Sequence, residues 1–469
     1  MESEFNLRSN TPENDHLDKG AAAMVEPAEL RTPLSLVPGT SRARIGAMAP
    51  PSLVVQKYGG SSLADADRIK HVAGRIAQER EAGSQLVVVV SAMGDTTDHL
   101  LAAAASITDE PDPRELDLLL ATGEHMSGTL VAMALHALSM PAISLTGAQA
   151  GIRTDRSHGR ARIANVDPAR VRRELEGGRI VIVAGFQGST DESHLDGEVT
   201  TLGRGGSDTT AVALAAQLAA DRCEIYTDVE GIFTADPRLV PDARLLAVIG
   251  YEEMLELAHQ GAQVMQTRAV ELGWVNAVEI AVRSTFSSHP GTRIKEDPDV
   301  EQRNKVRGLA SDRHVAKVTL VAVPDRPGVA RHVFEPLAEA GVNVDMIVQN
   351  VSHAGTTDMS FTVPRTDLAR AKKVLEPVVR ELGARELTTD TAVAKVSIVG
   401  AGIQNAPGYA ARMFGCLADE NINIEMISTS DIRITCILPE DDMERAVRAL
   451  HRAFELEQPE EVEARVAAG

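Results

Sequence analysis

The sequence contains few aromatic residues and few cysteines. Only 3% of the 469 residues are Phe, Trp or Tyr, and the three cysteines are Cys223, Cys416 and Cys436. Their spacing matches no metal-binding pattern and suits a reducing compartment. The cores must therefore be built mainly from Ala, Val, Leu and Ile, for which the 43% apolar content is sufficient.

Positive charge is also scarce. The net charge is −20, and the sequence contains no long basic run, which argues against nucleic acid as the main partner. A protein of this charge that binds anions must concentrate its positive charge locally. No apolar run reaches the length of a membrane span, so we expect a cytoplasmic protein that has no membrane partner.

Residues 1–50 differ from the rest of the chain. They are rich in Ser, Pro, Asn, Glu and Arg and lack periodicity, which predicts disorder. They also lack the apolar centre of a signal peptide. The globular pattern begins at Leu53, shortly after Met48. Translation from Met48 and a genuine flexible tail are both compatible with this pattern, and mass spectrometry of the native N-terminus distinguishes them.

From Leu53 onward, short apolar runs alternate with helical patterns. The predicted strands are 53–56, 86–90, 142–145, 180–184, 224–227 and 278–283, and the predicted helices are 65–81, 115–138, 168–176, 209–220 and 251–272. This alternation predicts an α/β domain over residues 51–290, with a mainly parallel central sheet covered by helices. In such sheets ligands bind beyond the carboxyl ends of the strands, where the glycine motifs of this chain lie.

The last third of the sequence repeats itself. After a polar stretch at 291–314, interpreted as a linker with one short strand at 306–309, two similar segments follow at 315–390 and 391–469. Each is predicted to be a βαββαβ-like α+β sandwich. A Pro-Gly pair precedes the first helix of each unit, and its backbone N–H groups suit a small anionic or zwitterionic ligand. A purely structural duplication is the alternative.

The segment from Glu198 to Ala216 is the most informative one. Its glycines allow the backbone to approach a bound group closely. Ser207 and Asp208 are favourable residues for a helix N-terminus, which attracts anions. Arg204 adds a fixed fork for a carboxylate or phosphate. The segment therefore suits an acidic small molecule, although an ordinary strand-to-helix turn with a solvated Arg fits equally well.

Three other segments carry candidate groups, each with a bland alternative. Lys57, at a strand end before two glycines, suits contact with transferring phosphate oxygens, but a surface lysine near a turn fits as well. Glu124 can hold a substrate ammonium, although solvated glutamates are commoner. The hydroxyls of 91–98 can hold substrate or cap a helix. Residues 223–237 are candidates for nucleotide contact or simply a strand followed by an Asp-Pro turn.

Taken together and in this order, the motifs resemble those of the aspartate kinase family, which belongs to the amino acid kinases. They are Lys-Tyr-Gly-Gly-Ser-Ser at 57–62, Ser-Ala-Met-Gly-Asp-Thr-Thr-Asp at 91–98, Thr-Gly-Glu at 122–124, Leu-Gly-Arg-Gly-Gly-Ser-Asp-Thr-Thr-Ala at 202–211 and Tyr-Thr-Asp-Val-Glu-Gly-Ile-Phe-Thr-Ala-Asp-Pro-Arg at 226–238. The repeated C-terminal units resemble tandem ACT domains. The resemblance covers residues 53–456.

The resemblance implies phosphorylation of the β-carboxylate of L-aspartate by ATP with Mg²⁺, which gives 4-phospho-L-aspartate, the first step towards lysine, threonine and methionine. It implies that Lys57 neutralises the γ-phosphoryl charge, that Asp208 orients Lys57, and that Mg²⁺ is held through ATP. The implied substrate-binding residues are Asp95, Thr96, Thr97, Glu124, Arg204, Gly205, Gly206 and Ser207. The implied ATP-binding residues are Lys57, Tyr58, Gly59, Gly60, Ser91, Ser207, Tyr226, Thr227, Ile232, Phe233, Thr234, Ala235, Asp236 and Pro237.

The resemblance of the ACT pair implies feedback control by lysine, threonine or both. It also implies a homo-oligomer or an α2β2-type assembly formed through the ACT domains. The effector positions are Asp325, Gly328, Val329, Asn343, Val344, Asp345 and Gln349 in the first unit, and Tyr409, Ala410, Asn423, Ile424 and Ser430 in the second. Asp325 and Asp345 suit the ammonium group of an amino acid.

Two positions depart from the family pattern. Gln263 stands where many relatives carry a Lys that faces the nucleotide, and His125 stands where many carry Arg. Arg268 and Arg238 are candidates to replace the missing charge. Two other functions are therefore considered. One is an amino-acid-binding regulatory protein without kinase activity. The other is a different acyl-phosphate-forming amino acid kinase, which does not explain the two ACT units.

Overall fold

The structure is a computed structural model that describes residues 51–190, 197–203, 205–262, 264–296, 304–350, 355–403 and 407–459. The predictions made for residues 1–50, and for Arg204 and Gln263, lie outside these ranges.

The first domain, which spans the strands from Leu53 to Ile294 and is named the catalytic-type domain, is built on an eight-stranded sheet. The strand order is β10-β12-β11-β9-β1-β2-β6-β3. Neighbouring strands are parallel except β11 and β12, so the predicted mainly parallel sheet is confirmed. The strands are β1 (Leu53–Tyr58), β2 (Gln85–Val90), β3 (Ala142–Leu145), β6 (Ile180–Ala184), β9 (Arg222–Thr227), β10 (Val248–Ile249), β11 (Ile280–Ser284) and β12 (Thr292–Ile294).

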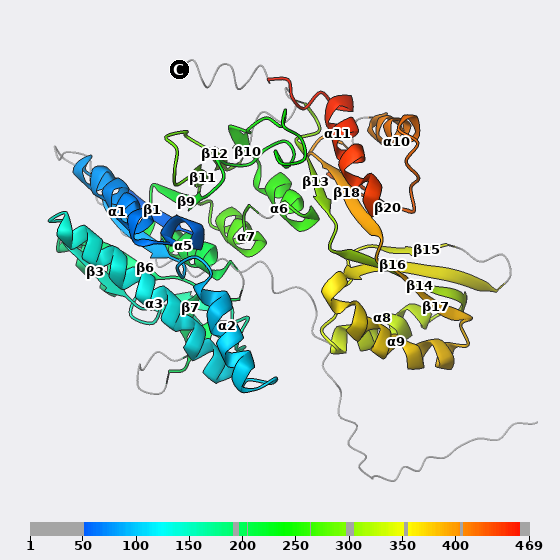
Figure 1. The fold of residues 1–469 in the computed structure, drawn as a ribbon, viewed down its shortest axis with the longest axis horizontal. Helices are drawn as coiled ribbons and strands as arrows, with labels where there is room; N and C mark the ends of the chain where they lie inside the picture. The colour runs from blue at the N-terminus through cyan, green and yellow to red at the C-terminus, as the bar shows by residue number, and fades with distance from the viewer. Residues whose placement is uncertain are drawn as a thin grey trace, which may run out of the picture. The chain divides into compact units, whose positions relative to one another are not determined.

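Helices cover both faces of this sheet (Figure 1). Alternate residues of β1, β2 and β6 pack in one core with α1 (Ala66–Glu81) and α3 (Pro113–Ala137). The residues between them pack in a second core with α4 (Ala169–Glu176) and α5 (Gly206–Leu218). Because both faces are buried, the central strands are near-continuous runs of Val, Ile and Leu.

The structure adds elements that the periodicity did not predict. Helix α2 (Thr96–Ile107) follows β2 and has no buried residue, so it lacks the apolar stripe that marks a packed helix. A second, four-stranded sheet has the order β5-β4-β7-β8. Its strands are only three or four residues long: β4 (Ile152–Thr154), β5 (Ile163–Val166), β7 (Gln187–Ser189) and β8 (Val199–Thr201).

The prediction of one helix over 251–272 is wrong, because the structure has two helices there. Helix α6 (Tyr251–Gln260) ends at Gly261, and α7 (Thr267–Val275) begins after a short connection. Gly261 has φ +123°, and a Cβ at this position would lie 2.5 Å from the carbonyl oxygen of Ser311. Only glycine fits this close approach, and a continuous helix cannot pass through it.

One described helix meets the length and hydropathy criteria of a membrane span, contrary to the prediction. This helix is α3, with 25 residues, and half of its most apolar window is buried inside the protein. Core helices of globular domains meet the same criteria, and α3 packs on the central sheet.

The first ACT unit is the predicted βαββαβ sandwich. Its sheet has the order β15-β16-β14-β17, and its two helices lie side by side against it (Figure 1). The elements are β14 (Val315–Pro324), α8 (Val329–Glu339), β15 (Ile347–Gln349), β16 (Thr356–Pro364), α9 (Leu368–Leu382) and β17 (Glu386–Asp390).

The second ACT unit takes one of its four strands from a distant part of the chain. Its sheet has the order β13-β18-β20-β19, and β13 occupies the place that β17 holds in the first unit. The elements are β13 (Gly308–Asp312), β18 (Val393–Val399), α10 (Tyr409–Asp419), β19 (Met426–Ser430), β20 (Arg433–Pro439) and α11 (Met443–Ala453). The stretch 291–314, expected to be a linker, thus contributes β12 and β13 to two sheets.

Reciprocal ion pairs join the two ACT units. Lys317 of the first unit contacts Glu425 of the second at 2.9 Å, and Lys395 of the second contacts Asp345 of the first at 2.7 Å. The two lysines hold equivalent positions in the repeat, as do the two acids. This is the pattern of an isologous interface, here within one chain.

Candidate active site

The chemistry-bearing motifs meet at the carboxyl edge of the central sheet. In register, Tyr58 of β1 pairs with Val90 of β2 and with Tyr226 of β9. Beyond these pairs, the Gly59 N–H donates to the Tyr226 carbonyl at 3.2 Å, and the Ser91 N–H donates to the Tyr58 carbonyl at 3.1 Å. The segments that start at residues 57, 91 and 226 are therefore neighbours.

Lys57 and Asp208 form an ion pair at this edge. The Lys57 Nζ lies 2.7 Å from the Asp208 Oδ1, and both side chains are about one-tenth exposed. Asp208 is in the first turn of α5, whose N-cap Gly205 has the left-handed φ of +71°. A charged pair at a helix N-terminus, still reachable from solvent, suits the binding of an anionic group.

Glu124 of α3 is a buried carboxylate with one unused oxygen. It is 3% exposed, and its Oε1 accepts from the Ala92 N–H at 3.1 Å. Its Oε2 is buried and has no hydrogen-bond partner. Burial raises the pKa of Glu124 to about 7, against the lowering effect of its backbone hydrogen bonds. An unpaired buried carboxylate of this kind is suited to a cationic ligand group.

Close backbone contacts join Glu124 to the strand ends. A Cβ at Gly60 would lie 2.8 Å from the carbonyl oxygen of Ala92, the residue that donates to Glu124. A Cβ at Gly123 would lie 2.9 Å from Ala92 Cβ and 3.5 Å from Thr96 Cγ2. Glu124 thus lies beside the first turn of α2, where Asp95 is exposed and Thr96 and Thr97 are partly buried.

His125 follows Glu124 on α3 and has its own partner. Its Nε2 lies 2.7 Å from the Gln187 Oε1, while the Gln187 Nε2 donates to the Ala121 carbonyl at 3.1 Å. Because this amide orientation makes Oε1 the acceptor, the His125 Nε2 is the donor. The His125 side chain is therefore held in place by a buried glutamine.

The two tyrosines expected at the nucleotide do not offer their rings to a ligand. Tyr58 and Tyr226 are fully buried and stack with ring centroids 4.8 Å apart. The Tyr226 hydroxyl donates to Glu224 at 3.0 Å, and the Arg75 guanidinium lies over its ring. Any nucleotide contact of these two residues must come from their backbone.

The segment 232–237, also expected along the nucleotide, is divided. Ile232, Thr234 and Ala235 are buried, whereas Phe233, Asp236 and Pro237 are partly or fully exposed. The Thr234 hydroxyl lies 2.9 Å from the Nε2 of His451 in the second ACT unit. This contact between the catalytic-type domain and an ACT helix has no sequence signal and was not predicted.

The two arginines considered as substitutes for the missing lysine are both engaged. Arg238 is exposed and paired with Asp236 at 2.8 Å. Arg268 donates to the carbonyls of Leu202 at 2.8 Å and Ala161 at 3.0 Å. Within the described ranges, no group of three or more His, Cys, Asp or Glu side chains is arranged to hold a metal ion.

The expected effector positions lie at equivalent places in the two ACT units. Gly328 and Gly408 are left-handed N-caps of α8 and α10, with φ of +94° and +104°. Asp325, Asn343 and Gln349 are exposed, as are Asn423 and Ser430. Val329 is buried, and Val344, Ala410 and Ile424 are partly buried. Asp345 is paired with Lys395, and Tyr409 stacks on Phe454.

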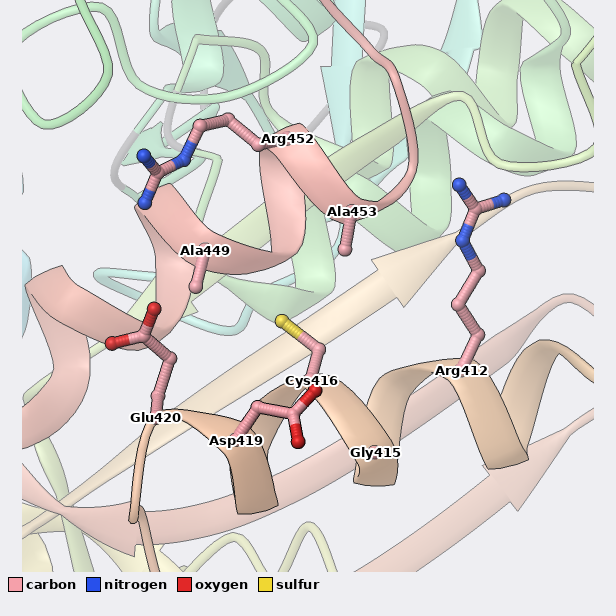
Figure 2. Close-up of a pocket in the computed structure, with 8 residues that line it drawn as sticks. All are labelled: Arg412, Gly415, Cys416, Asp419, Glu420, Ala449, Arg452 and Ala453. Atoms are coloured by element: carbon pink, nitrogen blue, oxygen red, sulfur yellow. The ribbon is translucent and has the colours of Figure 1, made fainter.

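A separate open hollow of about 710 Å³ lies between α10 and α11 (Figure 2). It is lined by Arg412, Gly415, Cys416, Asp419, Glu420, Ala449, Arg452 and Ala453. Burial and the neighbouring Glu420 and Asp419 raise the pKa of the Cys416 thiol, so it is a poor nucleophile. Both charge signs are mixed in this hollow, and it holds none of the residues expected at a site.

Family models match each of the three domains. The amino acid kinase family model matches residues 52–283, and ACT domain models match residues 317–380 and 396–454. An aspartokinase from Corynebacterium glutamicum is 51% identical over 410 residues, which covers 86% of this chain and 96% of that protein. This chain belongs to the aspartate kinase family. An aspartate kinase from Pseudomonas putida is 50% identical over 409 residues, covering 87% and 98% of the two chains.

Solved aspartate kinases share the fold. Aspartokinase III of E. coli in complex with aspartate and ADP matches with a TM-score of 0.70 at 27% identity, covering 86% of this chain and 99% of that one. The same enzyme in complex with lysine and aspartate matches with a TM-score of 0.66. An aspartate kinase of Clostridium acetobutylicum matches with a TM-score of 0.69 at 25% identity. The chain is thus a phosphotransferase with an amino acid kinase domain and two ACT domains.

Proposed function

We propose that this chain transfers the γ-phosphoryl group of ATP to the β-carboxylate of L-aspartate and gives 4-phospho-L-aspartate. The observation that carries the proposal is the open oxygen of buried Glu124, at the same sheet edge as the Lys57–Asp208 pair. An amino acid substrate brings the ammonium that this carboxylate lacks, and a phosphate brings the anion that Lys57 can meet.

The residues act mainly by positioning and by charge. Lys57 neutralises charge on the transferring phosphoryl group, and Asp208 holds the lysine in place. Glu124 binds the substrate ammonium, and Arg204 binds a substrate carboxylate. The accepting carboxylate is already ionised at neutral pH, so no general base is needed. The ATP phosphates carry Mg²⁺. The aspartate and ADP in the E. coli complex support this substrate pair.

The ACT units confer feedback control by lysine, threonine or both, in the first step towards lysine, threonine and methionine. The lysine complex of the E. coli enzyme supports an amino acid effector. The effector ammonium meets Asp325 or Asp345, and binding shifts the population towards an inactive state. The protein acts in the cytoplasm and assembles through its ACT units as a homo-oligomer or an α2β2-type complex.

The direct test is ATP turnover with L-aspartate and Mg²⁺, with the acyl phosphate trapped as a hydroxamate. Aspartate-dependent product is expected, and it should fall when lysine plus threonine is added. Competing amino acid substrates in the same assay separate aspartate from other acceptors. Absence of product, combined with effector binding by calorimetry, would instead favour the regulatory protein suggested by Gln263.

Asp325→Ala tests the effector assignment. We expect normal turnover without effector and inhibition that needs about tenfold more effector, since one charge-assisted contact is lost. Half-inhibitory concentrations of lysine and threonine measure this. Inhibition identical to that of the unmodified protein would remove Asp325 from the effector site.

A further inference from the structure

The start of α7 makes contacts at and just before the glycine turn, which contains Gly203, Gly205 and Gly206. One guanidinium nitrogen of Arg268 donates to the carbonyl of Leu202, the residue before Gly203, and another donates to the carbonyl of Ala161. Gln266 fills the space over Gly205, where a Cβ would lie 1.6 Å from its Cγ. Leu202 is buried and accepts this bond at the end of a strand segment, so the contact fixes backbone rather than a loose side chain.

Backbone hydrogen bonds join the glycine turn to the first turn of α5, which carries Asp208. The Gly206 N–H donates to the Gly203 carbonyl at 3.0 Å, and the Asp208 N–H donates to the Gly205 carbonyl at 3.1 Å. Asp208 in turn contacts Lys57. Arg268 therefore holds Leu202, the residue before the glycine turn, and the helix that begins after this turn carries the Asp208 carboxylate.

Helix α6, which precedes α7 in the chain, is bonded to the second ACT unit. Gln260 accepts from the Ser397 hydroxyl at 3.1 Å, and Glu256 pairs with Arg433 at 2.8 Å. A short segment after Gly261 joins α6 to Gln266. The segment that contacts the glycine turn is thus covalently continuous with the helix on the ACT sheet.

We propose that Arg268 and Gln266 are positioning residues for phosphoryl transfer, which set the glycine turn and thereby the Lys57–Asp208 pair, and that α6 ties this setting to the second ACT unit. The proposal rests on the proposed kinase function of the turn. In this role Arg268 acts through the backbone of Leu202, to whose carbonyl it donates.

The test compares Arg268→Met with a matched control, Arg172→Met. Arg172 donates to the Gln217 carbonyl at 2.7 Å, so it makes the same type of contact at the opposite end of α5. Both variants are expected to melt at similar temperatures. Arg268→Met should raise the KM for aspartate and lower kcat, each by about tenfold, because small misplacements of positioned groups are costly. Arg172→Met should change neither constant by more than about twofold.

Two further variants separate positioning from folding. Arg268→Lys keeps one donor and is expected to restore part of the lost kcat/KM. Gln266→Ala empties the space over Gly205 and should impair kcat/KM for aspartate, whereas Gln266→Met refills it and should restore the value. These measurements remain decisive if Arg268→Met fails to fold.

The outcomes are distinct from those that test the reaction itself. If the unmodified chain phosphorylates aspartate but Arg268→Met matches Arg172→Met in both kinetic constants, the positioning role is wrong. If Gln266→Ala and Gln266→Met are kinetically equal to the unmodified chain, the part assigned to Gln266 is wrong. If the unmodified chain makes no acyl phosphate from any amino acid, the proposed function is overturned, and the positioning role with it.

Discussion

Two buried glutamates of the catalytic-type domain have opposite electrostatic environments. Glu124 and Glu224 are 3% and 2% exposed. Burial raises the pKa of both, but for Glu224 the contacts with Gln56, Arg283 and Arg222 outweigh burial and lower the pKa below its ordinary value. Glu124 receives one backbone N–H, and its pKa rises to about 7. Equal burial thus accompanies a complete partner set in one case and an incomplete set in the other.

The difference between the two partner sets indicates which carboxylate is available to bind a ligand. Glu224 satisfies its oxygens within the protein and holds β9 against its neighbours, as structural buried charges do. Burial destabilises the ionised form of Glu124, and a bound cation would offset this cost. A missing partner, rather than burial or a perturbed pKa alone, distinguishes the carboxylate that we propose for the ligand.

The largest effect is expected at Lys57, which lies at the same sheet edge as Glu124. Lys57→Ala should lower kcat by at least about 10³-fold, because the γ-phosphoryl charge loses its counter-charge in a partly buried site. The circular dichroism spectrum should remain that of the unmodified protein. Lys70→Ala removes an exposed lysine that pairs with Asp67 at 3.2 Å, and should leave turnover intact. Near-normal turnover of Lys57→Ala would refute the role of Lys57.

The second prediction separates function from stability at Glu124. Glu124→Gln should raise the KM for aspartate about 100-fold, since a neutral amide lacks the charge that attracts an ammonium. It should also stabilise the fold at pH 8 by roughly 3 kcal/mol, because one pKa unit corresponds to about 1.4 kcal/mol of cost for the ionised form. Urea unfolding and initial-rate kinetics measure the two effects. A destabilised variant with unchanged KM would reverse the comparison.

The matched change at Glu224 should give the opposite result. Glu224→Gln removes the negative charge that Arg222 and Arg283 share, and we expect a loss of about 3–5 kcal/mol in unfolding free energy. The KM for aspartate should stay within about twofold in the folded variant. A selective loss of aspartate affinity would place Glu224 in the site instead.

The smallest expected effect is a pH dependence. Because the pKa of Glu124 is raised to about 7, the carboxyl takes up a proton below that pH. The KM for aspartate should therefore rise about tenfold for each unit by which the pH falls below about 7. Ionisation of Glu124 should also cost stability as pH rises from about 5 to 8. Glu224, whose pKa is lowered, contributes stability at neutral pH that is lost only at acid pH. Glu124→Gln should flatten the KM profile between pH 6 and about 8.

The sequence predicted the parts of the fold that repeat a simple pattern. Strands 142–145 and 180–184 coincide with β3 and β6, because both are short, mainly apolar runs between turns, with Ser144 the one polar residue. The periodicity did not show the break at Gly261, since buried residues recur at helical spacing in α7. It also did not predict that β13 belongs to the second ACT sheet, because strand pairing across an entire domain leaves no local signal.

For the site, the sequence predicted positions better than contacts. The motifs at 57, 91 and 226 meet at one sheet edge, as their places after parallel strands implied. The burial of the Tyr58 and Tyr226 rings was not foreseeable, since an aromatic residue at a strand end suits a base or a core equally. The bonds of Thr234 to His451 and of Arg268 to Leu202 depend on tertiary packing alone.

Strand β13 also has a consequence for the order of synthesis. It leaves the ribosome before the whole first ACT unit, whereas its partner β18 follows that unit, and Asp312 finally pairs with Lys395. The second unit cannot close its sheet until the first has been made, and a folded first unit shortens the loop that must be closed. The first ACT unit is therefore an insert with adjoining ends, a geometry that tolerates exchange. A chain started after residue 312 would contain that insert intact but leave the edge of β18 without its strand.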